Sequence, residues 1–224
     1  MIVLAIDTAS ALCAACVYDA AEARELGRAV LDLGKGHAER LMDVVHDAMA
    51  QADVDFRQLE RIAVAVGPGS FTGVRVGVSA ARGFAMALKV PAVGVTTLEA
   101  IAAQAREEFG AKTVMVALDA GREEINVAIY DESGALVHGP AAAPLSDVAE
   151  LARKQSPLLV GSAAQAVAEK AAGLRVGSPG MTADIRFYAM LGSAKQVGKK
   201  PKPLYLREAD AKPQAGFVLP RITP

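Results

Sequence analysis

Short apolar runs separated by polar turns dominate the beginning of the chain. The pattern predicts strands at residues 2–6, 12–18 and 24–33, and the short turns between them favour an antiparallel meander. Longer segments with an apolar face and further short apolar runs follow. They predict a helix at 38–52, a strand at 61–66, a helix at 74–88, a strand at 91–95 and a helix ending at 108.

The same order of predicted elements begins again after residue 112. It comprises strands at 113–118 and 125–130, a third strand from 135, a helix at 147–154, a strand at 157–160 and a helix at 162–172. Asp119 follows Asp7 by 112 residues, and Asp131 follows Asp19 by the same interval. We interpret this as an internal duplication, with chance similarity between two apolar meanders as the alternative. A closing helix is predicted at 181–195.

Duplicated βββαβα halves are the plan of the α/β proteins of the actin, sugar kinase and Hsp70 (ASKHA) superfamily. In that superfamily two similar lobes clasp a nucleotide, and the turn after the first strand of each lobe holds phosphate. We therefore predict this fold class, with an N-terminal lobe at 1–105, a C-terminal lobe at 106–198 and a C-terminal tail at 199–224.

The two turns that would hold phosphate depart from the superfamily pattern, which is Asp-x-Gly followed by Ser, Thr or Gly. Glycine lets backbone N–H groups approach a phosphate closely. The first turn has Ala9 in place of that glycine, and the second has Arg122 in place of the hydroxyl. We expect vestigial nucleotide turns, with no nucleotide bound tightly by the chain alone. The candidate residues are Asp7, Thr8, Ser10, Asp119 and Gly121.

A glycine-rich loop separates the strand at 61–66 from the helix at 74–88. The N–H groups that open such a helix form an anion site in principle. The loop matches neither the P-loop nor the dinucleotide pattern, so a tight turn without a ligand is the alternative. Thr72 is predicted to cap the helix. The candidate residues of this glycine loop are Gly67, Pro68, Gly69, Ser70, Phe71, Thr72, Gly73 and Arg75.

Composition narrows the function classes. The chain has 224 residues, 52% of them hydrophobic, and a formal net charge of −1, which argues against a surface that grips nucleic acid by itself. No apolar run is long enough for a membrane span and the start lacks a signal-peptide pattern, so a cytoplasmic location is expected. Cys13 and Cys16 lie in a predicted strand, where residues three apart face opposite sides, and are interpreted as reduced packing residues.

Five segments together resemble the bacterial TsaB (YeaZ) family. They are residues 1–9, His37-Ala38-Glu39-Arg40-Leu41, the glycine loop extended to Gly77, Pro91 to Leu98, and Pro203-Leu204-Tyr205-Leu206-Arg207. The resemblance implies a scaffold and activator that works with TsaD and TsaE. Together they transfer a threonylcarbamoyl group to the adenosine beside the anticodon of certain tRNAs. With the phosphate turns eroded, binding of ATP and Mg²⁺ is expected to be possible only within that complex.

The spacing of the histidines favours a subunit that lacks a metal site and catalytic residues. Catalytic relatives carry two histidines one helical turn apart, whereas here His37 is followed by Leu41. His46 and His138 are too scattered to complete a site. His37 is expected to cap a helix or to form another hydrogen bond.

The helices at 38–52 and 74–88 carry more apolar residues than one packed face requires. We expect them to dock a partner subunit, and to form a homodimer in the isolated chain. Burial inside one chain is the alternative. The predicted interface residues are Leu41, Val45, Ala48, Met49, Val74, Val78, Ala81 and Arg82.

Two other functions stay open at the level of sequence. The first is an independent enzyme of the same fold, such as a kinase, acyl transferase or metallopeptidase. The second is direct RNA binding through Lys199, Lys200 and Lys202, although a solvated linker is the favoured interpretation of that run.

Overall fold

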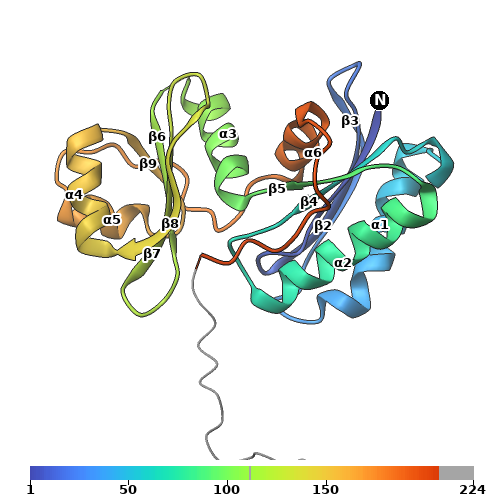
Figure 1. The fold of residues 1–224 in the computed structure, drawn as a ribbon, viewed down its shortest axis with the longest axis horizontal. Helices are drawn as coiled ribbons and strands as arrows, with labels where there is room; N and C mark the ends of the chain where they lie inside the picture. The colour runs from blue at the N-terminus through green and yellow to red at the C-terminus, as the bar shows by residue number, and fades with distance from the viewer. Residues whose placement is uncertain (111, 207–224) are drawn as a thin grey trace, which may run out of the picture.

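The computed structural model describes residues 1–110 and 112–206, which form two lobes that each contain one sheet (Figure 1). The first lobe contains β1 (Ile2–Asp7), β2 (Leu12–Asp19), β3 (Arg24–Asp32), α1 (His37–Ala52), the 3-10 helix η1 (Phe56–Gln58), β4 (Arg61–Ala65), α2 (Phe71–Leu88) and β5 (Ala92–Val95). Helix α3 (Thr97–Phe109) leads to the second lobe. There follow β6 (Val114–Asp119), β7 (Glu124–Tyr130), β8 (Leu136–Pro144), α4 (Leu145–Gln155), β9 (Leu158–Val160), α5 (Ala164–Lys170) and α6 (Ile185–Ala194).

The two sheets repeat one topology. The first has the strand order β3-β2-β1-β4-β5 and the second has β8-β7-β6-β9. In each, the first strand pairs antiparallel with the second and parallel with the strand that follows the first helix of its lobe. The βββαβα order predicted for both halves is therefore confirmed.

Helices cover the sheets in layers (Figure 1). Helices α1 and α2 lie on the outer face of the first sheet, and α4 and α5 on the outer face of the second. Helices α3 and α6 lie between the sheets and pack against each other. Burial of both sheet faces accounts for the near-continuous apolar runs of β1 and β6.

The packing of α6 corrects the predicted lobe boundaries. This helix contacts β1, β2, β4 and β5 of the first sheet, and Phe187 and Tyr188 belong to the first lobe's core. Helix α3 starts in the predicted first lobe but packs on β6 and β7. Each sheet has an inner face that must be buried, and helices distant in sequence supply the cover.

Helix ends correct two predictions. Helix α2 begins at Phe71, and its N-cap is Ser70, whose Oγ accepts a hydrogen bond from Gly73 N at 3.2 Å. Thr72 lies in the first turn and is exposed, so it is not the cap. His37 is the first residue of α1 and is buried, but its side chain makes no capping hydrogen bond. The capping box of Thr96 and Glu99 at α3 agrees with the sequence.

The predicted interface residues are mostly interior. Seven of the eight are buried in the first lobe's own core, because α1 and α2 press that side onto the sheet; they are Leu41, Val45, Ala48, Met49, Val74, Val78 and Ala81. The contact is close: a Cβ on Gly27 of β3 would lie 2.5 Å from Ala48 O of α1. Those seven side chains are therefore largely withdrawn from the surface, whereas Arg82 is exposed.

The end of the described chain also differs from the predicted linker. Pro201 is buried, and Leu204 N donates a hydrogen bond to Val66 O at 2.8 Å. Residues 201–206 therefore pack against the first lobe, while residues 207–224 of the predicted tail lie outside the described residues. None of the described helices combines the length and apolar character needed to cross a membrane.

Both cysteines are free and buried on β2. The thiol of Cys16 contacts Ile185 O of α6 at 3.7 Å, whereas Cys13 is three residues earlier on the strand and so faces the other side. Burial raises the pKa of Cys13 to about 11, and it raises that of Cys16 further. Both thiols are therefore protonated at neutral pH, in agreement with a packing role.

Candidate functional site

The glycine loop packs directly on the turn that follows β1. Ser70 N donates to Ala9 O at 2.7 Å, and Thr8 Oγ1 donates to Gly73 O at 2.7 Å. A Cβ on Gly69 would lie 2.1 Å from Ala9 O, and one on Gly73 would lie 2.0 Å from Thr8 O. The absence of side chains at these two glycines is what lets the loop and the turn touch.

The carboxylate of Asp7 is enclosed at this contact. Its side chain is 1% exposed; Oδ1 accepts from Ala9 N at 2.8 Å and Oδ2 accepts from Thr182 Oγ1 at 2.6 Å. Thr182 Oγ1 lies 2.7 Å from the hydroxyl of Tyr188 on α6. Burial raises the pKa of Asp7, although the hydrogen bonds from Thr182 and Ala9 oppose that shift.

The sequence did not predict Thr182 and Tyr188 as partners of Asp7. They lie 175 and 181 residues further along the chain, in and just before the closing helix. Only the packing of α6 on the first sheet brings them to the turn. The polar residues of the β1 turn are therefore satisfied by α2 on one side and by the α6 region on the other.

The corresponding turn after β6 closes on itself. Asp119 is exposed, and its Oδ1 accepts from Gly121 N at 2.7 Å. Asp119 N donates to Ser162 Oγ at 3.0 Å, which ties the turn to the segment before α5. Gly121 has a φ of +73°, so the glycine retained in this turn has a conformational reason to be there.

Aromatic residues join the glycine loop to the end of the described chain. The rings of Phe71 and Tyr205 lie 5.5 Å apart, and the guanidinium of Arg75 lies 3.7 Å from the Phe71 centroid. Arg75 Nε also donates to the Tyr205 hydroxyl at 2.7 Å. The sequence marked Phe71 and Arg75 as loop residues and Tyr205 as part of the tail, but gave no sign that they stack.

A shallow groove runs between the exposed sides of α1 and α2. Its volume is about 460 Å³, and it is lined by Ala38, Leu41, Met42, Thr72, Arg75, Val76, Ser79 and Ala80. Met42 is 55% exposed, and the Phe71 ring at the start of α2 is 56% exposed. We call this surface the α1–α2 groove. Only its edge overlaps the predicted interface, at Leu41.

The histidines do not come together. Among the described residues, no group of three or more His, Cys, Asp or Glu side chains is arranged to hold a metal ion. Buried His37 has no hydrogen-bond partner at Nε2. The residue one helical turn further along α1 is the aliphatic Leu41, which cannot ligate a metal. This part of the chain has no donor set of the kind that zinc or iron sites use.

The chain has relatives among known proteins. A family model described as "TsaD: tRNA N6-adenosine threonylcarbamoyltransferase" matches residues 32–210. The tRNA threonylcarbamoyladenosine biosynthesis protein TsaB of Escherichia coli (strain K12) is 34% identical over 142 residues, which is 62% of this chain and 59% of that protein. An uncharacterized protein of Mycobacterium tuberculosis (strain ATCC 25618 / H37Rv) is 35% identical over 216 residues, 95% of each chain.

Solved structures give the same result. A Pseudomonas aeruginosa protein described as similar to the peptidase YeaZ has a TM-score of 0.78 and 27% identity, over 92% of this chain and 99% of that one. YeaZ from the same organism has a TM-score of 0.72 and 26% identity, over 86% and 91%. An Arthrobacter polyphosphate/ATP-glucomannokinase shares the fold alone, at a TM-score of 0.52 and 16% identity over 86% and 98%.

The duplicated lobes and these neighbours define an α/β protein of the actin, sugar kinase and Hsp70 class. Its relatives also give a narrower assignment. The chain belongs to the TsaB/YeaZ family.

Proposed function

We propose that this protein acts in the biosynthesis of threonylcarbamoyladenosine in tRNA, as a non-catalytic scaffold and activator. Its partners would be a TsaD-like catalytic subunit and a TsaE-like ATPase, with tRNA bound through the complex. The names of its relatives support the process. The observation that carries the non-catalytic role is the closed turn at Asp7.

A working nucleotide turn needs backbone N–H groups and a carboxylate that face the ligand. Here both carboxylate oxygens of Asp7 accept hydrogen bonds from the protein, and Ala9 N is one of their donors. The Thr8 hydroxyl donates to Gly73 O. Because these groups are directed inward, the chain alone is proposed to bind ATP and Mg²⁺ weakly or not at all.

The α1–α2 groove is the surface that we propose for the TsaD-like subunit. It presents the exposed Met42 side chain beside Val76 and Ala80, and Met adapts its shape to a partner. Exposed apolar side chains that line one groove, with Arg75 at its edge, suit a partner helix whose apolar face carries an acidic residue.

The test is a titration of the chain with the TsaD-like subunit of the same organism, followed by a tRNA modification assay. Met42→Glu is expected to weaken the complex at least tenfold, because it buries a charge in the groove. Val137→Glu is the matched control, since Val137 is 56% exposed on β8 of the other lobe. Omission of either subunit is expected to abolish modification.

Two results would contradict the proposal. One is equal binding by the Met42→Glu variant and the wild type. The other is ATP turnover by the isolated chain that disappears in Asp7→Asn, which would favour the independent enzyme.

A further inference from the structure

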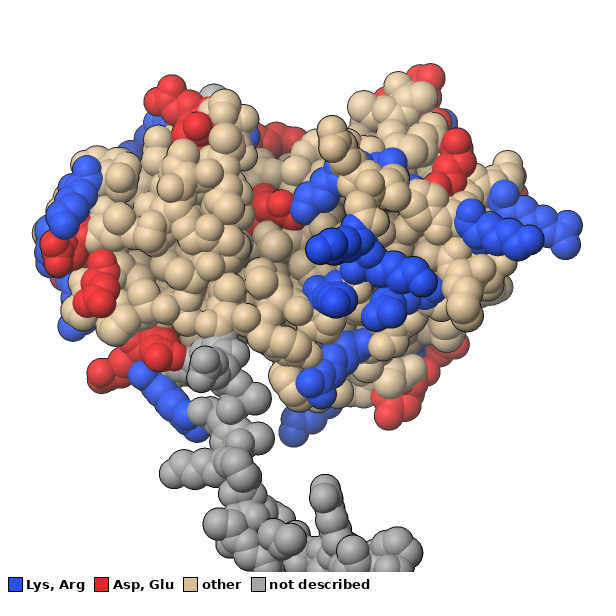
Figure 2. Space-filling view, in the orientation of Figure 1, with Lys and Arg blue, Asp and Glu red and all other residues tan. Residues whose placement is uncertain are grey.

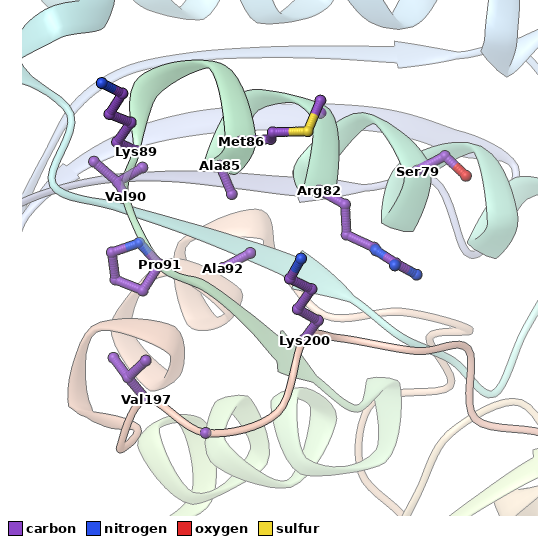
Figure 3. Close-up of a pocket in the computed structure, with 12 residues that line it drawn as sticks. Ser79, Arg82, Ala85, Met86, Lys89, Val90, Pro91, Ala92, Val197 and Lys200 are labelled. Atoms are coloured by element: carbon purple, nitrogen blue, oxygen red, sulfur yellow. The ribbon is translucent and has the colours of Figure 1, made fainter.

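A second hollow lies on the first lobe, between the later turns of α2 and the segment after α6 (Figure 3). Its volume is about 630 Å³. It is lined by Ser79, Arg82, Gly83, Ala85, Met86, Lys89, Val90, Pro91, Ala92, Val197, Gly198 and Lys200. We call it the α2–tail pocket; Ser79 is the one residue that the lining shares with the α1–α2 groove.

The α2–tail pocket has an unbalanced positive charge. Arg82 comes from α2, Lys89 is the C-cap residue that follows this helix and Lys200 comes from the tail, while none of the described lining residues is acidic. No ion pair joins any of these three to another residue in the described ranges, in contrast to Arg28, which pairs with Glu25 and Asp184. Three cations without counter-ions around one hollow attract an anion.

Arg82 and Lys200 approach the pocket from separate parts of the chain, whereas the side chain of Lys89 points away from them (Figure 3). Arg82 extends from α2 toward the tail, and Lys200 extends from the tail toward α2 (Figure 3). The position of Lys200 is fixed by its neighbours, because Pro201 is buried against β5 near Gly94 and Leu204 is hydrogen-bonded to Val66 O. The backbone that carries Lys200 is therefore held against the first lobe.

Part of the lining of the pocket is apolar. Met86 is 79% exposed on α2, while Val90, Pro91 and Val197 lie together on a different side of the pocket (Figure 3). A flat base packs well on such a surface while its phosphate meets the cations. Lys199 and Lys202 flank Lys200, and Figure 2 shows Lys and Arg side chains spread over this face of the first lobe. A patch longer than the pocket favours a chain of phosphates over a single small anion.

We propose that the α2–tail pocket binds backbone phosphates of RNA, with one base against Pro91 and Val197. This inference rests on the proposed function, which supplies the RNA, and it adds a contact made by this chain itself. The near-neutral net charge of the whole chain implies that the contact is weak alone and useful within a complex that holds the RNA at other points.

The test measures binding of a labelled anticodon stem-loop RNA to the complex of this chain with its TsaD-like subunit, over a range of salt concentrations. The double variant Arg82→Glu, Lys200→Glu is expected to lower the RNA affinity at least tenfold. The slope of log affinity against log salt should fall by about 2, because each of the two cations neutralises one phosphate in the wild type. Because neither Arg82 nor Lys200 lines the α1–α2 groove that is proposed for the TsaD-like subunit, the variant should bind that subunit as the wild type does.

The matched control is Arg24→Glu, Lys170→Glu, which changes the net charge equally at exposed positions on β3 and α5. An equal loss of RNA affinity in this control would overturn the inference, because the effect would come from total charge. Unchanged RNA affinity in the pocket variant would overturn it too, and would leave the proposed function standing. Displacement of the RNA by inorganic phosphate at low millimolar concentration would instead assign the pocket to a small anion.

Melting curves check that each variant folds, and Arg82→Gln, Lys200→Gln provides a milder second variant. If the wild-type chain fails to bind the TsaD-like subunit at all, the proposed function is wrong, and that outcome is seen before any RNA is added.

Discussion

At the scale of single residues, the surroundings of Asp7 differ from those of a carboxylate that binds a metal–nucleotide. Asp7 is buried, and its oxygens accept hydrogen bonds from Ala9 N and Thr182 Oγ1. Burial without a cation in contact raises the pKa of this carboxyl. The aspartate that the sequence suggested as a vestige of a nucleotide site therefore contributes to packing between β1 and the α6 region.

This environment predicts a pH effect on stability. Because the pKa of Asp7 is higher in the folded than in the unfolded state, the folded protein holds a proton that the unfolded chain loses above pH 3.8. The contribution of Asp7 to the free energy of unfolding therefore falls as the pH rises above that value. Asp7→Asn removes this penalty, so its stability relative to wild type should increase from pH 4 to pH 7. Denaturant titrations of both proteins at several pH values measure the difference, and a constant or opposite difference would contradict it.

The glycines give a second prediction at this scale. Gly69→Ala places a Cβ against Ala9 O and should destabilise the protein by about 1–3 kcal/mol. Gly83→Ala is the control, since Gly83 lies within α2 with open space around it. It should stabilise the protein by about 0.5–1 kcal/mol, because alanine favours the helix. Urea denaturation measures both changes; equal effects of the two substitutions would show that the loop does not need its close approach.

At the scale of elements, hydrophobic periodicity was sufficient to predict the strands and most helices of both lobes. The parallel between Asp7 and Asp119 also pointed to the repeated topology, because each ends the first strand of its sheet. The pattern could not predict which apolar residues of α1 and α2 stay exposed once the helices pack on the sheet. Val45 and Met42 are both apolar and three residues apart on α1, yet one is buried and the other exposed. That distinction depends on how the helix is rotated on the sheet.

The rotation of α1 is open to a direct test. Val45→Glu buries a charge in the first lobe's core and should destabilise the protein by about 3–5 kcal/mol or prevent folding. Met42→Glu, on the solvent side, should change stability by less than about 0.5 kcal/mol. Circular dichroism during guanidinium denaturation gives both values. A folded and stable Val45→Glu protein would mean that this side of α1 is not in the core.

At the scale of the whole molecule, the two lobes are joined through α3 and α6. Each of these helices packs on a sheet other than the one that its place in the sequence suggests. Arg28 on β3 contacts Asp184, the N-cap of α6, at 2.8 Å, and Arg61 on β4 donates to carbonyls at the end of α6. Arg186 of α6 meets Glu107 of α3 at 2.6 Å. Such long-range pairs have no local signal, so the position of the closing helix could not be predicted from the pattern.

The exposed α1–α2 groove predicts the state of the isolated protein. Without its partner subunit, the chain should form a homodimer of twice its 23.1 kDa mass, because two grooves can cover each other. Light scattering after size-exclusion chromatography measures this mass as concentration is varied. Met42→Glu should shift the equilibrium toward the monomer and Val137→Glu should not. If the wild-type protein stayed monomeric at all concentrations, the prediction of a homodimer would be wrong.

The place of α6 also bears on how the protein is made. During translation β1, β2 and β4 emerge long before residues 185–194, so one side of the first sheet has no cover until most of the polypeptide has left the ribosome. The nascent chain therefore depends on a late segment to complete its earliest structure, and this interval is when chaperones or premature self-association would act on it.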